Sequence, residues 1–208
     1  GARRSFADGL SGRSYAIALR DREGASLPAS KVVASFDRFK AFAKDNPHEI
    51  FLLSRLGCDS LGFTDEKMYP HFRDCPPNVR LPGVWRARQD PSYEVLAITG
   101  LTSLKPICVE LTRDVLKLMT HFFQTTKPVQ RFIVGDDEGV DAAAAEFLMQ
   151  KGFEVEVVRA NWDEHKGRAG AVRNRLMALP STRVLLIDDG SCAKSAHMRK
   201  VAASEGLE

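Results

Sequence analysis

Short apolar segments alternate with helical segments through the second half of this 208-residue chain, and this alternation restricts the fold more than any other feature of the sequence. Each segment has the length of a strand and is mainly apolar, and residues 184–187 are apolar throughout, which is typical of a strand buried on both faces. The sequence therefore predicts the α/β class, with a parallel sheet covered by helices on both faces. The expected strands are residues 94–99, 131–134, 153–158 and 184–187, and the expected helices are residues 109–123, 140–151, 169–179 and 193–204.

The first half is less regular. Strands are expected at residues 14–19 and 50–53, a helix beginning at Pro28, and a short helix at residues 65–72. Prolines, a glycine and charges interrupt the apolar pattern at residues 82–92, so we place a domain boundary there. This predicts a smaller α/β domain at residues 1–88 and a larger one at residues 93–208. We expect a strand to be missing at each end, as in a fragment of a longer chain.

Composition excludes several classes of protein. A hydrophobic content of 44% with 27% charged residues is typical of a soluble globular protein. No apolar run approaches the roughly 20 residues of a membrane span, and no signal peptide is recognisable, so we expect a cytoplasmic protein without a membrane partner. The net charge of +3 does not favour nucleic acid as a partner. The four cysteines and five histidines lack metal-type spacing, so neither a metal nor a cofactor is expected.

Small, glycine-bearing loops follow three of the expected strands. Ligands of parallel sheets bind outside the carboxyl ends of the strands, and the first N–H groups of a helix there favour phosphate. The sequence therefore predicts a binding site for a phosphorylated, nucleotide-type ligand in these loops. Its candidate residues are Gly100 and Ser103 after the first strand, Gly135, Asp136, Gly139 and Asp141 after the second, and Gly190, Ser191, Lys194 and Ser195 after the fourth.

Acidic residues in the same loops have several interpretations. Asp136, Asp137, Glu138, Asp188 and Asp189 are suited to accepting hydrogen bonds from a ribose, to binding a metal, or to capping a helix. For Asp137 and Glu138 we favour capping.

Arg173 and Asn174 lie in the middle of the expected helix 169–179, beside apolar residues. A guanidinium near a core-facing helical surface usually has a fixed anionic partner. That partner is either a ligand or a carboxylate of the protein, and the sequence leaves both open. Trp85 and Trp162 are expected to pack, with base stacking as an alternative for Trp162.

The second half resembles the SLOG superfamily, a Rossmann-like group that includes the DprA/Smf proteins and the LOG phosphoribohydrolases, and is most similar to the YspA-like branch. The resemblance rests on motifs that occur in the same order, and it implies a Rossmann-like domain with a nucleotide site. The motifs are residues 98–100, 135–141, 160–162, 166–170, 173–177 and 190–198.

One position argues against the activity of the LOG enzymes. Their catalytic glutamate, which acts in cleaving an N-glycosidic bond, corresponds to Met198. A thioether neither donates nor accepts a proton as a carboxylate does. The resemblance therefore favours binding over catalysis, and whether the chain is an enzyme stays open.

The first half resembles a macrodomain-like bacterial family on residues 14–17, 54–63, 78–79 and Trp85. Macrodomains bind ADP-ribose with a glycine loop after a strand. The resemblance implies a second site at Gly57, Cys58, Ser60, Gly62 and Phe63. The alternative is an ordinary glycine turn.

Three functions remain in view. The first is binding or sensing of a nucleotide-derived small molecule of the ADP-ribose, NAD or nucleotide monophosphate type, with a role in bacterial or phage conflict, including phage defence. The second is a nucleotide N-glycosidase that uses Asp136 or Asp141. The third is a DprA-like DNA-handling module with Arg168, Arg173, Arg175, Lys194, Arg199 and Lys200 on its surface. We also expect a homo-oligomer, by resemblance.

Overall fold

The computed structural model describes residues 8–58, 61–101, 113, 117, 119–121, 124, 128–188 and 192–207. It divides the chain into two compact units, Gly1–Leu81 and Pro82–Glu208. Each unit has its own sheets, so each is described by itself. No helix among the described residues is long and apolar enough to cross a membrane.

The first unit is built around one amphipathic helix. Its elements are β1 (Gly9–Ser11), β2 (Ser14–Ala16), α1 (Ala29–Asp45), β3 (Phe51–Leu52), α2 (Asp65–Met68), the 3-10 helix η1 (Tyr69–His71) and β4 (Val79–Arg80). Strands β1 and β2 form an antiparallel pair, and β3 and β4 a parallel pair. Among the described residues this unit therefore has two small sheets rather than one central sheet.

Helix α1 begins directly after Pro28, as predicted. The spacing of its aromatic residues buries Phe36 and Phe39. The ring centroid of Phe36 lies 4.7 Å from that of Phe72, and the ring centroid of Phe39 lies 5.7 Å from that of Phe51. Such aromatic pairs are a large part of the core of a small unit. The side-chain amide of Asn78 closes the other end of the helix by donating to carbonyl oxygens there.

The second unit contains a four-stranded parallel sheet. Its elements are α3 (Gly83–Gln89), β5 (Val95–Gly100), β6 (Arg131–Val134), α5 (Val140–Gln150), β7 (Val155–Val157), α6 (Trp162–His165), the 3-10 helix η2 (Lys166–Arg168), α7 (Ala169–Ala178), β8 (Arg183–Ile187) and α8 (Ala193–Ser204). The predicted strands and the predicted helices from residue 140 onward are all present. Of the expected helix 109–123, the described residues Arg113, Lys117 and 119–121 are helical.

The seam expected at residues 82–92 is not irregular throughout. Gly83–Gln89 is a helix, α3, and its first N–H bonds to the carbonyl of Leu179 at 2.8 Å. A Cβ on Gly83 would lie 2.0 Å from the carbonyl oxygen of Ser181, so only glycine allows this close approach. The glycine and prolines of this segment predicted irregular structure, whereas packing against the rest of the unit stabilises a helix there.

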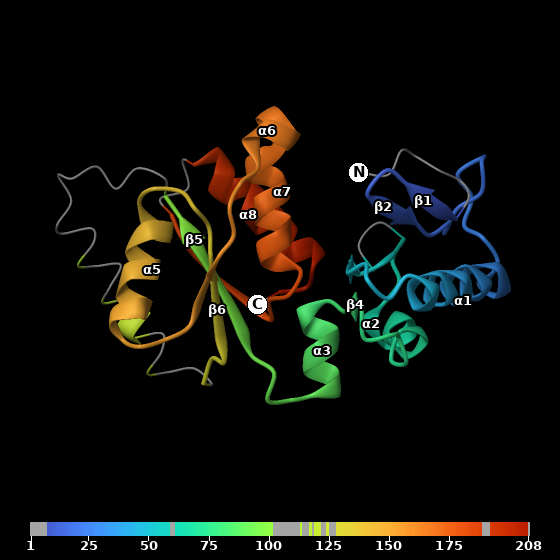
Figure 1. The fold of residues 1–208 in the computed structure, drawn as a ribbon, viewed down its shortest axis with the longest axis horizontal. Helices are drawn as coiled ribbons and strands as arrows, with labels where there is room; N and C mark the ends of the chain where they lie inside the picture. The colour runs from blue at the N-terminus through green and yellow to red at the C-terminus, as the bar shows by residue number, and fades with distance from the viewer. Residues whose placement is uncertain are drawn as a thin grey trace. The chain divides into compact units, whose positions relative to one another are not determined.

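Alternate residues of β5 face opposite sides of the sheet, as a strand requires. Leu96 and Ile98 join one apolar cluster with α5, whereas Val95 and Ala97 join another with Met177 and Met198 of α7 and α8. Figure 1 shows α5 on one face and α7 and α8 on the other. The predicted α/β class with helices on both faces is confirmed, and the fold is Rossmann-like.

The strand order β7-β6-β5-β8 places a reversal of winding at β5. The chain adds β6 and β7 on one side of β5 and then crosses back to place β8 on the other side. In sheets of this kind the crevice at the reversal, outside the carboxyl ends of the strands, is the usual ligand position. The carboxyl ends of β5 and β8 are therefore where a site is to be sought.

Candidate functional site

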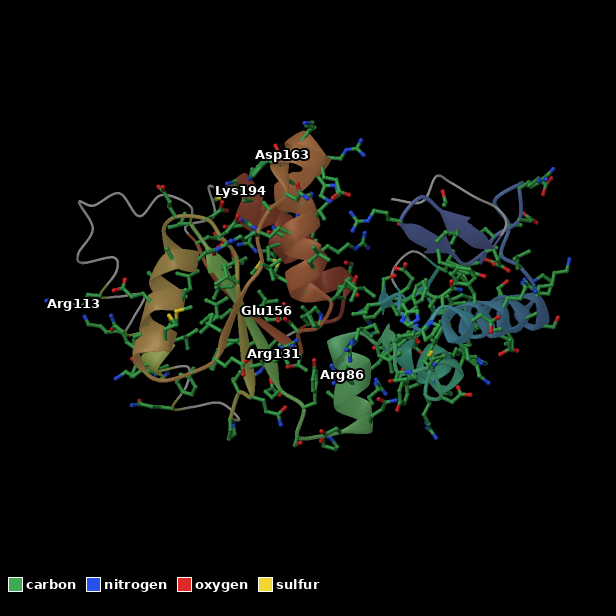
Figure 2. The ribbon with its side chains drawn as sticks, in the orientation of Figure 1. Arg86, Arg113, Arg131, Glu156, Asp163 and Lys194 are labelled. Carbon is green, nitrogen blue, oxygen red and sulfur yellow. The ribbon has the colours of Figure 1, made fainter. Side chains whose placement is uncertain are left out.

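Most of the predicted site residues lie at the carboxyl edge of the sheet. Gly100 ends β5, Gly135 follows β6, and Lys194 and Ser195 lie in the first turn of α8. Figure 2 shows Lys194 at the start of α8 and Asp163 on α6 toward the same end of the unit, with Arg131 and Glu156 farther down the view. Ser103, Gly190 and Ser191, as well as Asp189, lie outside the described residues.

Arg173 is the centre of a charged network at this edge. Its side chain is only 2% exposed, and its two terminal nitrogens donate to Asp136 Oδ1 and Asp137 Oδ2, each at 2.7 Å. Burial opposes the charge of the guanidinium, but the hydrogen bonds to Asp137 and Asp136 and the charges of Asp137 and Asp141 outweigh burial and raise the pKa of Arg173. The anionic partner of Arg173, which the sequence left open, is therefore supplied by the protein.

Lys194 and Asp141 complete this network. The ammonium of Lys194 lies 3.2 Å from Asp137 Oδ1, so Asp137 is paired with two cations. Burial alone would raise the pKa of Asp137, but Arg173 and Lys194 lower it below its ordinary value. Asp141 is almost wholly buried, and this burial raises its pKa although Thr99 donates a hydrogen bond to it. Two neighbouring carboxyls thus have pKa values shifted in opposite directions.

Asp137 does not cap a helix, contrary to our expectation. Helix α5 has Gly139 at its N-cap, at φ +90°, and no side chain caps it. The carboxylate of Asp137 turns to Arg173 and Lys194 instead, because a buried cation is a stronger partner than an N–H group. Sequence reasoning thus missed Asp137 as a member of the site. Two features of the sequence could have predicted its role: the consecutive aspartates Asp136 and Asp137 in a loop, and the core-facing Arg173 on a later helix, which requires an anionic partner.

Close packing within the protein explains two of the predicted glycines. A Cβ on Gly135 would lie 2.1 Å from Asp141 Oδ2 and 3.2 Å from the guanidinium carbon of Arg173. A Cβ on Gly100 would lie 2.0 Å from the carbonyl oxygen of Ile187. The sequence assigned both glycines to a ligand site, whereas here the groups that lie close to them belong to β8, α5 and α7.

Helix α8 begins without a side-chain cap. Its N-cap is Cys192, and Asn174 of α7 lies beside its first turn, donating from Nδ2 to the carbonyl of Lys194 at 3.3 Å. The hydroxyl of Ser195 is buried and bonds to no oxygen or nitrogen among the described residues. The nitrogen Nε of Arg173 is likewise buried without a partner in that part of the chain. Two unsatisfied donors close to an uncapped helix start are unusual in a folded interior.

The loop after β7 is tied to the same network. Asp136 Oδ2 accepts a hydrogen bond from the N–H of Ala160 at 3.1 Å, and Asn161 caps the short helix α6. Trp162, expected to pack, is 52% exposed and presents its ring to solvent, whereas Trp85 is fully buried as expected. The exposed indole near the carboxyl edge favours the stacking alternative for Trp162.

Met198 is fully buried in the apolar cluster with Met177 and Ala97. The position that the resemblance to LOG enzymes aligns with their catalytic glutamate therefore contributes to the core. Several of the basic residues considered for DNA binding are also engaged: Arg173 is buried, and Arg199 donates to Asp188 at 3.0 Å.

The glycine loop of the first unit is closed on itself. The carbonyl of Gly57 accepts hydrogen bonds from the N–H groups of Leu61 and Phe63, at 3.2 and 3.1 Å. The ring of Phe63 covers Gly57, which has φ +72°, and Cys58 donates to Asp65 at 3.6 Å. Gly62 has φ +67°. Ser60 lies outside the described residues. The N–H groups of Leu61 and Phe63 are thus used within the loop, which favours the ordinary glycine turn among the described residues.

No group of three or more histidine, cysteine, aspartate or glutamate side chains suited to a metal ion occurs among the described residues. No protein-family model and no curated protein matches the chain. A solved structure, DNA processing protein A (DprA) from Streptococcus pneumoniae, is similar to 56% of this chain at 16% sequence identity with a TM-score of 0.44. The chain corresponds to about half of that protein, 49% of its length.

Proposed function

We propose that the second unit binds a phosphate-bearing, nucleotide-type small molecule at the start of α8, between the carboxyl ends of β5 and β8. The observation that carries this proposal is the uncapped N-terminus of a 12-residue helix placed where the winding of the sheet reverses. The first N–H groups of such a helix carry partial positive charge and lack partners within the helix. A phosphate oxygen satisfies these donors and the favourable field together.

Charge at the edge is compatible with an anion because the aspartates are already paired. Asp136 and Asp137 face Arg173, and Asp137 also faces Lys194. In this proposal Arg173 is not a phosphate ligand. It is a positioning residue that holds the two aspartates away from the ligand and neutralises them. Lys194, whose side chain is 45% exposed, is the cation that a bound phosphate meets.

The exposed indole of Trp162 supplies a surface for the base. Ala160 bonds to Asp136, and Trp162 follows two residues later at the start of α6. A solvent-exposed aromatic ring can stack on a nucleotide base whatever the identity of that base. A ligand with both a phosphate and a base therefore fits the edge better than inorganic phosphate alone.

Thermal and chemical unfolding with a ligand panel tests the proposal. AMP, ADP-ribose and NAD are compared with adenosine, which lacks the phosphate. A ligand at 100 times its dissociation constant is expected to add about 2.7 kcal/mol to the free energy of unfolding. Lys194→Met is expected to weaken this effect, and Lys200→Met, an exposed lysine farther along α8, is the matched control.

The proposal fails if no phosphate-bearing ligand stabilises the protein more than adenosine does. It also fails if Lys194→Met and Lys200→Met reduce the affinity equally, because the start of α8 then has no special role.

A second candidate is the N-glycosidase, favoured by one observation. The opposite pKa shifts of Asp137 and Asp141 resemble the division between a base and an acid in hydrolytic sites. Two facts weigh against it: Asp141 is 1% exposed, and both carboxylate oxygens of Asp136 already accept hydrogen bonds, from Arg173 and from the N–H of Ala160. Incubation with nucleotide monophosphates decides the matter. Release of free base that Asp136→Asn or Asp141→Asn abolishes would establish the enzyme.

A further inference from the structure

The charged side chains around the start of α8 balance one another in number. Arg173 donates to Asp136 and to Asp137, each at 2.7 Å. The ammonium of Lys194 lies 3.2 and 3.3 Å from the two carboxylate oxygens of Asp137. Two cations therefore face two carboxylates, and Asp141, a buried carboxyl close to the same guanidinium, adds no positive charge. These side chains thus supply no surplus positive charge to an anionic ligand.

Two further basic side chains of α8 do not supply that charge either. Arg199 donates to Asp188 at 3.0 Å, and the side chain of Asp188 is only 3% exposed, so a buried carboxylate matches this cation. His197 turns Nδ1 toward the amide nitrogen of Asn174 at 3.4 Å. An amide nitrogen only donates, so Nδ1 accepts, and a ring with an accepting nitrogen is neutral. The field of the helix N-terminus, equivalent to about half an elementary charge, remains to attract an anion.

Asp137 is fixed in place beside the cation that a bound phosphate meets. Its Oδ2 atom accepts from the guanidinium of Arg173, which is buried, and its own side chain is 17% exposed. A phosphate that reaches Lys194 therefore also comes close to a carboxylate that cannot turn away. Because like charges repel more strongly at a partly buried site than in water, Asp137 opposes each negative charge that the phosphate brings.

Phosphate groups differ in how many charges they bring. A terminal phosphate monoester carries about two negative charges at pH 8, because its second pKa is about 6. A phosphodiester has an ester bond in place of the second acidic group and carries one negative charge. The field of the helix start compensates one charge better than two, and the second charge of a monoester would face Asp137 without a cation of its own among the described residues.

We propose that the site at the start of α8 selects an internal phosphate, esterified on both sides and singly charged, over a terminal phosphate monoester. Asp137 is the residue that determines this specificity, because it stays paired with Lys194 and rejects the second charge. The ligand class is then a nucleotide whose phosphate links two groups, as in a dinucleotide or a nucleotide diester. This inference rests on the proposed function, since it concerns the same site.

Calorimetric titration at pH 8 with AMP and with the 5′-methyl ester of AMP tests the selectivity. The two ligands share base and sugar and differ by one methyl group and one negative charge. The methyl ester is expected to bind more tightly, on the order of tenfold, although it is the larger ligand. If AMP binds as tightly as its methyl ester or more tightly, the proposed selectivity is wrong while the phosphate site stands. If neither ligand binds better than adenosine, the phosphate site itself is absent and both proposals fail.

Two variants that each remove one negative charge test the role of Asp137. Asp137→Asn releases Lys194 but keeps an oxygen that accepts from Arg173, so AMP is expected to gain more affinity than the methyl ester and the difference between them to disappear. Asp163→Asn, at an exposed position of α6 that Figure 2 labels, is expected to leave the ratio of the two affinities unchanged. Urea unfolding checks that both variants are folded.

Equal ratios in the Asp137→Asn and Asp163→Asn proteins overturn the role of Asp137, because the charge network then does not set the preference. The comparison of AMP with its methyl ester in the wild type needs no variant. It decides the selectivity even where Asp137→Asn is too unstable to titrate.

Discussion

The two edges of the parallel sheet both contain partly buried ion pairs, but the pairs differ in the elements that they join. At the amino edge, Glu94 accepts from Arg183 Nε at 2.5 Å and from Thr182 at 2.9 Å. These residues stand at the starts of β5 and β8, which are neighbours in the sheet, so the pair reinforces strand pairing. One carboxylate there faces one guanidinium.

At the carboxyl edge the partners come from elements that are distant in the chain. Arg173 of α7 lies 36 and 37 residues from the aspartates that it binds, and Lys194 reaches across from α8. Asp141 is a third carboxyl beside the same guanidinium. The comparison indicates that the ion pair at the amino edge joins neighbouring strands, whereas the carboxyl edge gathers charges from three helices and loops around the start of α8.

Removing Arg173 is expected to have the largest effect. Arg173→Met leaves Asp136 and Asp137 without their buried partner, and breaking a buried pair in this way costs about 3–5 kcal/mol. Urea unfolding measures the loss. Arg175→Met is the matched control two residues along α7, because its side chain is 61% exposed and its pair with Glu205 is 3.9 Å long. Because the guanidinium of Arg175 is exposed and its pair is long, although Glu205 is buried, its loss is expected to cost less than the loss of Arg173. Equal effects of the two variants would remove the distinction between a buried and an exposed guanidinium.

Gly135→Ala tests whether the carboxyl edge is as closely packed as its contacts indicate. The added methyl group meets Asp141 and Arg173, and overpacking of this kind costs about 1–3 kcal/mol. Gly170→Ala in α7 is the control, since nothing lies within 4 Å of its Cβ position, and it is expected to stabilise by about 0.4–1 kcal/mol. The melting temperatures are expected to move in opposite directions, and a change of the same sign would contradict the packing.

Arg183→Met is expected to cost less than Arg173→Met. Glu94 loses the guanidinium but keeps Thr182 as a donor, so we expect a loss of about 1.5 kcal/mol in urea unfolding. A loss as large as that of Arg173→Met would show that the two edges are equivalent.

The smallest expected effects are changes in the free energy of unfolding with pH. The pKa of Asp137 is lowered on folding, so its contribution to stability is present above its unfolded pKa near 3.8 and is lost as the pH falls from there through its folded pKa. The pKa of Asp141 is raised on folding, so this group costs stability once the pH rises from 3.8 through its folded pKa. A tenfold difference in proton affinity between the folded and unfolded states corresponds to about 1.4 kcal/mol.

Two single variants separate these contributions. Relative to the wild type, Asp137→Asn is expected to become less stable as the pH rises from 3 to 7, and Asp141→Asn to become more stable over the same interval. Urea unfolding at a series of pH values measures both. Parallel pH profiles for the two variants would contradict the assignment of opposite pKa changes.

The sequence by itself determined the elements of the second unit. Short apolar runs followed by helical segments specify strands and helices locally, because burial on both faces of a sheet favours apolar side chains in a strand such as Val95–Gly100, where Thr99 is the one polar residue. It also predicted that Arg173 has a fixed anionic partner, because a guanidinium among apolar residues requires one.

Only the tertiary structure decided which partner that is. The carboxylate of Asp137 could cap the following helix α5 or pair with a cation on α7 or α8. It pairs with the cations because the crossover connections bring α7 and α8 close to it. For the same reason α3 is a helix despite the proline and glycine at its start, and Trp162 is exposed rather than packed. Local patterns fix the strands and helices, whereas contacts between residues far apart in the chain exist only once those strands and helices have been assembled.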